Sequence, residues 1–288
     1  MPDRYSLPKA IGWSIAFVVL TFLLAGLLAF GVAAAIAGDS QGALAWLETN
    51  GPGATLVQAG TTIASTALAT WLIGIRVLGL SLTDLRYRVP QRGTGFGFGA
   101  LAGAVAAGVS LAIGAVAGGA EWVREQGTLA SYAQAAATTI LILAPAALGE
   151  ELLFRGVPLV LLAGALGRGS AVVLLAIVFS LAHLANPNVT MLGIGNIALA
   201  GVFLGLAFYA PGGIWTAWGA HLGWNAILAA LDTPVSGVPF PIPLLDYEPG
   251  DPAWLTGGPF GPEGGLASTI ALTIAVLVAR RWAGKDSA

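Results

Sequence analysis

The sequence predicts an all-α fold, a polytopic membrane bundle of about eight transmembrane helices with the N-terminus and the C-terminus cytoplasmic. Of its 288 residues, 57% are hydrophobic and 9% are charged, and the mean hydropathy is +0.84. Soluble domains carry roughly 25% charged residues, so most of this surface faces the lipid bilayer. The net charge of −2 offers no basic surface for nucleic acid, and the lack of cysteine excludes disulfides and thiolate chemistry.

Long apolar runs mark the first spans, because a transmembrane helix needs about 20 predominantly apolar residues. Such runs predict spans near 10–37, 54–75, 95–118 and 264–281. The first run is much longer than the roughly 7–15 apolar residues of a signal peptide, so we predict a retained helix there. A further long helical stretch covers 129–163.

Three more helices are expected in the central part of the chain. From Gly169 to Leu231 the sequence contains no Asp, Glu, Lys or Arg. Proline and glycine interrupt this region at "NPN" (186–188) and "PGG" (211–213), and such residues break helices. Two breaks leave room for three helices, which brings the expected number of spans to eight.

The distribution of basic residues predicts the orientation, because cytoplasmic flanks of spans are rich in Lys and Arg. With the N-terminus inside, most of the twelve basic residues fall on inner segments. They are Arg4, Lys9, Arg76, Arg86, Arg88, Arg92, Arg168, Arg280, Arg281 and Lys285. An even number of spans then places both termini in the cytoplasm, and we predict a multi-pass protein of the cell membrane.

The chain is expected to divide into three regions. Residues 1–128 hold the first three helices, 129–231 hold four helices with the candidate site, and 232–288 hold a proline-rich outer loop and the last helix. We assign no chemistry to the outer loop, which includes Glu263. No tandem repeat or separate soluble domain is visible in the sequence.

Glycines at helical spacing predict faces for close helix packing. Gly95, Gly99 and Gly103 are four residues apart, as are Gly201 and Gly205. Small residues at this spacing let two helix backbones approach closely in a membrane.

The octet "GEELLFRG" (149–156) places three charges inside an apolar helix. A charged side chain at membrane depth costs roughly 2.5–3.5 kcal/mol and marks a candidate functional site. Glu151 and Arg155 are four residues apart, so they can pair on one helix face. Glu150 lies about 100° around the helix from Glu151 and has no cation at helical spacing, so it requires a different explanation.

The positions of the two histidines of the chain suggest an explanation for Glu150. Glu151 and His183 each lie about 24 Å along their helices from an inner turn near Gly167, at 1.5 Å per residue. His221 and Asn225 are four residues apart and share a helix face. A lone histidine in an apolar helix most often makes an interhelical hydrogen bond. Two histidines near the depth of buried glutamates instead favour a shared, water-holding site.

These residues form three motifs in a recognisable order. "EELLFR" (150–155) fits Glu-Glu-x-x-x-Arg, "FSLAH" (179–183) fits Phe-x-x-x-His, and "HLGWN" (221–225) fits His-x-x-x-Asn. In this order, on hydrophobic helices, they resemble the CAAX prenyl endopeptidase and bacteriocin-processing family of intramembrane proteases, also called the Abi family. The resemblance covers roughly 129–231.

The resemblance implies an intramembrane endopeptidase that cleaves a membrane-associated peptide or protein, such as a prenylated or a bacteriocin- or pheromone-like substrate. It implies that Glu150 acts as general base and, with His183, activates a water molecule. It also implies that His221 and Asn225 orient this water or stabilise the oxyanion. Its expected partners are such a substrate and the lipid bilayer.

The same resemblance makes Glu151 a further catalytic candidate and Arg155, its ion-pair partner, a structural brace. Cofactor use stays open, because Glu150, His183 and His221 also form a possible zinc set. Asparagine is a poor zinc ligand, and the sequence has no His-Glu-x-x-His motif. We therefore favour a glutamate-activated water and keep zinc as the rival.

Two other classes of function compete with a protease. One is a non-catalytic membrane binding or immunity protein with the same fold. The other is a transporter in which Glu150 and His183 relay protons. Transporters of this kind are commonly built from internal repeats, and the sequence shows none.

Overall fold

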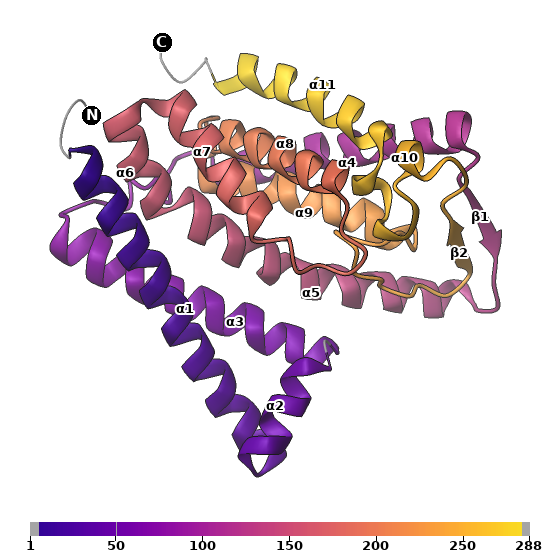
Figure 1. The fold of residues 1–288 in the computed structure, drawn as a ribbon, viewed down its shortest axis with the longest axis horizontal. Coiled ribbons are helices and arrows are strands. Elements are labelled where there is room, and N and C mark those ends of the chain that lie inside the picture. The colour runs from indigo at the N-terminus through magenta and orange to yellow at the C-terminus, as the bar shows by residue number, and fades with distance from the viewer. Residues whose placement is uncertain (1–5, 50, 284–288) are drawn as a thin grey trace. The chain divides into compact units, whose positions relative to one another are not determined.

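A computed structural model describes residues 6–49 and 51–283. These residues are helical apart from one small sheet, and 75% of them lie in helices (Figure 1). Arg4 and Lys285, two of the basic residues used to predict the orientation, lie outside the described ranges.

The chain forms two compact units. The first combines the described residues of Met1–Arg88 with Ile142–Ala171, and the second combines Val89–Leu141 with those of Val172–Ala288. The two units therefore share α5 and α7. The three regions expected from the sequence were defined by function, and they remain a prediction.

The first unit holds the N-terminal helices and the charged end of α5. Its elements are α1 (Leu7–Ala37), α2 (Ser40–Glu48), α3 (Pro52–Ala69), the π-helix η1 (Thr70–Val77), the later part of α5 (Leu129–Arg155) and α6 (Val157–Leu166). Helix α1 packs against α3 and α6. It ends at Gly38 in the left-handed conformation, and the Asp39 carboxylate then caps α2 by accepting the Gly42 N–H at 2.8 Å.

The long helix expected over 129–163 is broken at Gly156, between α5 and α6. Pro158 lies in the first turn of α6, where a missing N–H costs nothing. Any Cβ at Gly156 would collide with the Tyr87 hydroxyl, so only glycine fits there. Helix α5 itself continues through Pro145.

The second unit holds the remaining elements. They are α4 (Arg92–Gly118), β1 (Glu121–Arg124), the first part of α5, most of α7 (Arg168–Leu181), α8 (Met191–Phe208), α9 (Ile214–Ala230), β2 (Leu245–Glu248), α10 (Ala253–Thr256), the 3-10 turns η2 (Gly258–Phe260) and η3 (Pro262–Gly264), and α11 (Leu266–Ala283). The expected breaks at "NPN" and "PGG" thus separate three helices, α7, α8 and α9.

The proline-rich segment after α9 is held in place by a short sheet. Strands β1 and β2 are antiparallel, with Glu121 paired to Glu248 and Arg124 paired to Leu245. The Trp122 indole N–H donates to the carbonyl oxygen of Leu231 at 2.7 Å, just after α9. The segment is therefore tied to the end of α9.

The apolar helices make this a multi-pass membrane protein. Within the described residues, six helices are long and apolar enough to span a bilayer. They are Leu7–Ala37, Pro52–Val77, Arg92–Gly118, Leu129–Leu166, Met191–Phe208 and Leu266–Ala283. Helices α7 and α9 have 14 and 17 residues, fewer than the about 20 that a span needs. The count of eight spans and the cytoplasmic termini remain predictions.

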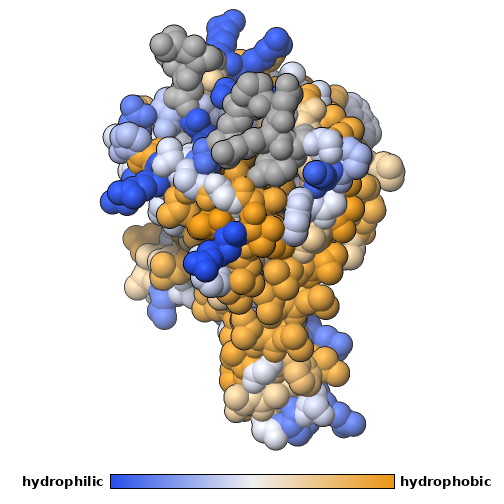
Figure 2. Space-filling view, turned by 90° about the vertical axis from the view of Figure 1, so that its left-hand side faces the viewer, coloured by the Kyte–Doolittle hydropathy of each residue, from blue (hydrophilic) through white to orange (hydrophobic). Residues whose placement is uncertain are grey.

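The outward-facing side chains agree with a lipid environment. Figure 2 shows a face on which apolar residues form a broad area bordered by hydrophilic ones. On α1, Phe22, Leu23 and Leu27 are 58–70% exposed. A soluble monomer rarely exposes a continuous apolar patch of more than a few hundred Å², so lipid is the natural solvent for such a surface.

The glycines of α4 form the packing face that the sequence predicts. A Cβ at Gly95, Gly99 or Gly103 would fall within the contact distance of atoms of α9 or the residues just before it. At Gly99 and Gly103 the colliding atoms are backbone atoms of Thr216 and Ala220. The α4 backbone therefore lies directly on α9, and this contact fixes the position of the helix that carries His221.

The second glycine pair packs in the same way. A Cβ at Gly201 would collide with Ala176 of α7, and one at Gly205 would collide with Val172. Both glycines therefore bring α8 close to α7, the helix that leads to His183.

We expect Gly103→Ala to lower the thermal unfolding temperature of the detergent-solubilised protein. The new methyl group would overlap the carbonyl oxygen of Ala220, and overpacking typically costs about 1–3 kcal/mol. Gly108→Ala is the matched control, because a Cβ there meets nothing within 4 Å on the same helix. Equal unfolding temperatures for the two variants would contradict the close α4–α9 contact.

Candidate active site

The charged end of α5 contains a buried ion pair in the first unit. Arg155 Nη1 donates to Glu151 Oε1 at 3.0 Å, and the two side chains are 3% and 0% exposed. The residues are four apart, so the helix itself brings them together. The pairing expected from the spacing is therefore present.

Glu150 occupies a different side of α5 from Glu151, because successive helical residues are about 100° apart. Its side chain is half-buried. The preceding residue, Gly149, packs against Thr62 of α3, where a Cβ would come within 3.2 Å of the threonine methyl carbon. Contact with α3 thus fixes the turn of α5 that presents Glu150.

His183 lies just after α7, in the second unit, and its tautomer follows from its hydrogen bond. Its Nδ1 lies 2.7 Å from the carbonyl oxygen of Phe179. A carbonyl oxygen only accepts, so Nδ1 carries the proton. In this tautomer, Nε2 is the ring nitrogen that can accept a hydrogen bond.

Phe179 brings the two histidines to one place. Its ring centroid lies 4.7 Å from that of His183 and 6.1 Å from that of His221. His221 and Asn225 project from α9, one helical turn apart. The segment just after α7 and helix α9 thus supply the imidazoles, and α9 also supplies the carboxamide.

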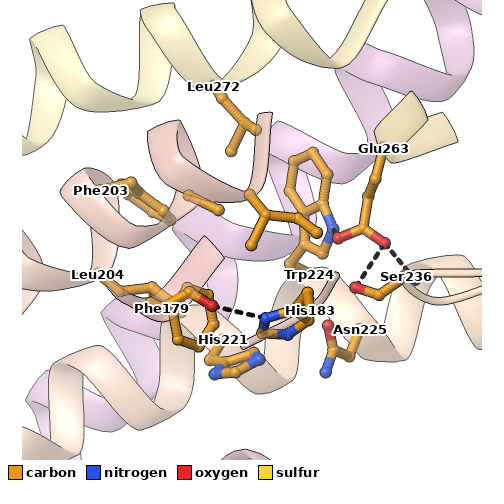
Figure 3. Close-up of a pocket in the computed structure, with 13 residues that line it drawn as sticks. Phe179, His183, Phe203, Leu204, His221, Trp224, Asn225, Ser236, Glu263 and Leu272 are labelled. Carbon is orange, nitrogen blue, oxygen red and sulfur yellow. Dashed lines mark hydrogen bonds between the residues drawn. The ribbon is translucent and has the colours of Figure 1, made fainter. Parts of the chain in front are cut away.

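These three side chains line one small cavity, together with Trp224 and Glu263. The cavity volume is about 30 Å³, and a water molecule needs roughly 10–15 Å³ of such space. Figure 3 shows the two imidazole rings and the carboxamide gathered together, with the Glu263 carboxylate beside them. The site can therefore hold water next to hydrogen-bonding groups. Glu150 and Glu151 belong to the first unit, and their approach to the cavity remains a prediction.

Glu263 is a cavity residue that the sequence analysis missed. It is 6% exposed, and its carboxylate accepts hydrogen bonds from Trp224 Nε1 at 3.2 Å, from Ser236 Oγ at 3.0 Å and from the Ser236 backbone N–H. Burial raises the pKa of Glu263, while these bonds and the nearby His183 act in the opposite direction. The available sign in the sequence was that Glu263 is an isolated acidic residue between a proline and a glycine, just before the span expected near 264–281.

The possible zinc set of Glu150, His183 and His221 remains a prediction, because Glu150 and the two histidines belong to different units. Among residues 6–49 and 51–283, no three His, Asp or Glu side chains gather closely enough to hold a metal ion.

A comparison with protein-family models identifies the central part of the chain. Residues 132–227 match the model described as Type II CAAX prenyl endopeptidase Rce1-like. The chain carries an Rce1-like domain. No curated protein and no solved structure matches the chain.

The match confirms the resemblance seen in the three motifs. The Rce1-like domain contains every candidate residue from Glu150 to Asn225, and it ends before Glu263. Rce1-like proteins are proteases that act on membrane-associated substrates, which supports peptidase activity for this chain.

Proposed function

We propose that this protein is an intramembrane endopeptidase that hydrolyses a peptide bond in a membrane-associated peptide or protein. One observation carries the proposal: His183, His221 and Asn225 line a single water-sized cavity, and they come from the segment that matches a family of endopeptidases. We further propose that substrates are prenylated or resemble bacteriocins or pheromones.

The proposed reaction begins with a water molecule in the cavity. Glu150 takes a proton from this water, and the His183 Nε2 lone pair accepts a hydrogen bond from its other hydrogen. The water oxygen attacks the carbonyl carbon of the substrate and gives a tetrahedral oxyanion. The C–N bond then breaks, and the proton held by Glu150 passes to the leaving nitrogen.

In this proposal, the side chains of Asn225 and His221 stabilise the oxyanion. The Asn225 amide and an N–H of His221 donate hydrogen bonds to it as negative charge develops. Each such donor is typically worth about 2.7–4 kcal/mol of transition-state stabilisation. Glu151 and Arg155 neutralise each other and hold the turn of α5 that presents Glu150.

We also propose that the protein lies in the cell membrane with eight spans and both termini in the cytoplasm. The charge distribution of the loops supports this orientation. The short helices α7 and α9 would then cross the bilayer within a helical bundle, where neighbouring helices cover their ends.

A direct assay tests the proposed activity. The purified protein in lipid nanodiscs is incubated with prenylated and unprenylated peptides, and products are identified by mass spectrometry. A variant with Glu150→Gln, His183→Ala, His221→Ala and Asn225→Ala serves as control. We expect cleavage by the natural protein alone.

A companion experiment compares new C-termini in cells that contain either form, which would reveal natural substrates. Absence of cleavage in both experiments would overturn the proposal. If cells that contain the fourfold variant remain protected from a bacteriocin, the protein would instead be a non-catalytic binding protein. Elemental analysis and chelator treatment of the active protein would decide whether zinc takes part.

A further inference from the structure

We propose that Glu263 is a positioning residue of this site, whose carboxylate holds the segment after α7 and the cavity face of α9 in their working arrangement. The inference rests on the proposed function, but its geometry can be tested independently. Glu263 lies outside the Rce1-like domain, in the segment that joins the sheet to α11.

The backbone of Glu263 is held in place by hydrogen bonds from α8. On α8, the buried Asn196 donates through Nδ2 to the carbonyl oxygens of Glu263 and Gly265, each at 2.8 Å. The Asn196 Oδ1 accepts from Thr269 Oγ1 at 2.7 Å, which fixes the amide orientation. The backbone at Glu263 is therefore bound to α8 on one side and to the start of α11 on the other.

The first partner of the carboxylate is a tight turn. Val235 and Val238 exchange two backbone hydrogen bonds of 2.9 Å. The central residues Ser236 and Gly237 have φ of 49° and 85°, as a two-residue hairpin turn of type I′ requires. This turn directs both the N–H and the hydroxyl of Ser236 at Glu263.

The same turn rests on the segment that carries His183. The Ser236 carbonyl oxygen accepts from Asn186 Nδ2 at 2.8 Å, and the Asn186 N–H donates to the His183 carbonyl oxygen at 3.1 Å. A Cβ at Gly237 would collide with the carbonyl oxygen of Pro187. A continuous chain of contacts therefore runs from Glu263 through the turn to His183.

The second partner is on α9. Trp224 donates its indole N–H to Glu263 and is 6% exposed. It lies between His221 and Asn225 in the sequence and forms part of the cavity wall. Its orientation therefore sets the space beside the carboxamide. Glu263 thus contacts both segments that supply polar groups to the cavity.

The burial of this carboxyl group is informative, because moving a carboxyl group out of water is unfavourable unless hydrogen bonds compensate for it. Three donors from two segments converge on Glu263. A purely structural clamp would affect stability alone, whereas a positioning residue would also change the environment of His183 and the rate of the reaction.

The test uses Glu263→Gln and a matched control, Asp232→Asn. Asp232 lies in the segment between α9 and β2 and accepts the N–H groups of Ile242 and Tyr247 at 2.7 and 3.3 Å. Each variant thus neutralises one hydrogen-bonded carboxylate, but Glu263 alone of the two lines the cavity. Because the chain has two histidines, ¹⁵N-histidine NMR of the full-length protein gives separable imidazole signals, which His221→Asn assigns.

We expect Glu263→Gln to shift the His183 imidazole signals and to lower kcat by about ten-fold or more, because small misplacements of reacting groups slow reactions strongly. We expect KM to change much less. Asp232→Asn should match the natural protein in both measurements. Ser236→Ala, which removes one of the three donors, should shift the same signals less.

The outcomes separate this inference from the proposed function. If the natural protein cleaves peptides and Glu263→Gln matches it in kcat and in imidazole signals, the inference is wrong and the proposed function stands. If no protein cleaves, the proposed function fails, and unchanged His183 signals would overturn the positioning as well. Should Glu263→Gln fail to fold, unchanged His183 signals in Ser236→Ala would overturn the inference.

Discussion

Glu150→Gln is expected to abolish peptide cleavage by the purified, folded protein. Glutamine keeps the size of the side chain but cannot accept the proton of the attacking water, and a general base contributes typically about 10²–10⁴-fold to the rate. The measurement is the initial rate of peptide cleavage in nanodiscs at saturating substrate.

Glu48→Gln is the matched control for this substitution. Glu48 is exposed at the end of α2, in the same compact unit as Glu150. Its variant should cleave at the natural rate. Full cleavage by Glu150→Gln would reject the assigned base, provided that both variants unfold at the temperature of the natural protein.

Helix positions were the most predictable part of the fold. The apolar runs near 10–37, 95–118 and 264–281 correspond to α1, α4 and α11. Composition decides these helices, because a backbone surrounded by lipid must satisfy its own hydrogen bonds. The glycine faces of α4 and α8 were also predictable from the sequence, since only very small residues allow two helix backbones to touch.

Features that depend on distant partners were not predictable. The close contact of Gly156 with the hydroxyl of Tyr87 joins two residues that lie far apart in the sequence. The pairing of Glu121–Arg124 with Leu245–Glu248 depends on two four-residue strands separated by most of the second unit. Glu121–Arg124 does not alternate between apolar and polar residues, and Leu245–Glu248 alternates over four residues only, which is too short to identify a strand with its partner.

The candidate site shows the same limit. The spacing of the motifs pointed to His183, His221 and Asn225, and the structure brings these three to one cavity. Their periodicity on apolar helices made them visible. Glu263 was assigned to an outer loop, because its glycine and proline neighbours give no sign that the segment turns back to the cavity. Its role depends on Asn196 and the turn at Ser236.

Arg155→Met is expected to destabilise the protein by about 3–5 kcal/mol, the usual cost of leaving one charge of a buried pair without its partner. Glu151 is fully buried and accepts the arginine at 3.0 Å. The measurement is the free energy of unfolding in one detergent. Arg88→Met is the control, because Arg88 is exposed in the same unit and surface changes usually stay within about 0.5 kcal/mol.

A double substitution decides whether the pair is the cause. If Arg155 acts through Glu151, the variant with both Glu151→Gln and Arg155→Met should be clearly more stable than the sum of the two single effects predicts, since no unpaired charge remains. Strictly additive losses would show that each side chain acts through other contacts. Because Glu150 directly precedes Glu151 on α5, a brace also predicts that the stabilised double variant regains part of the cleavage rate that Arg155→Met loses. A double variant that is stable but as slow as Arg155→Met would assign the charge of Arg155 a part in the reaction instead.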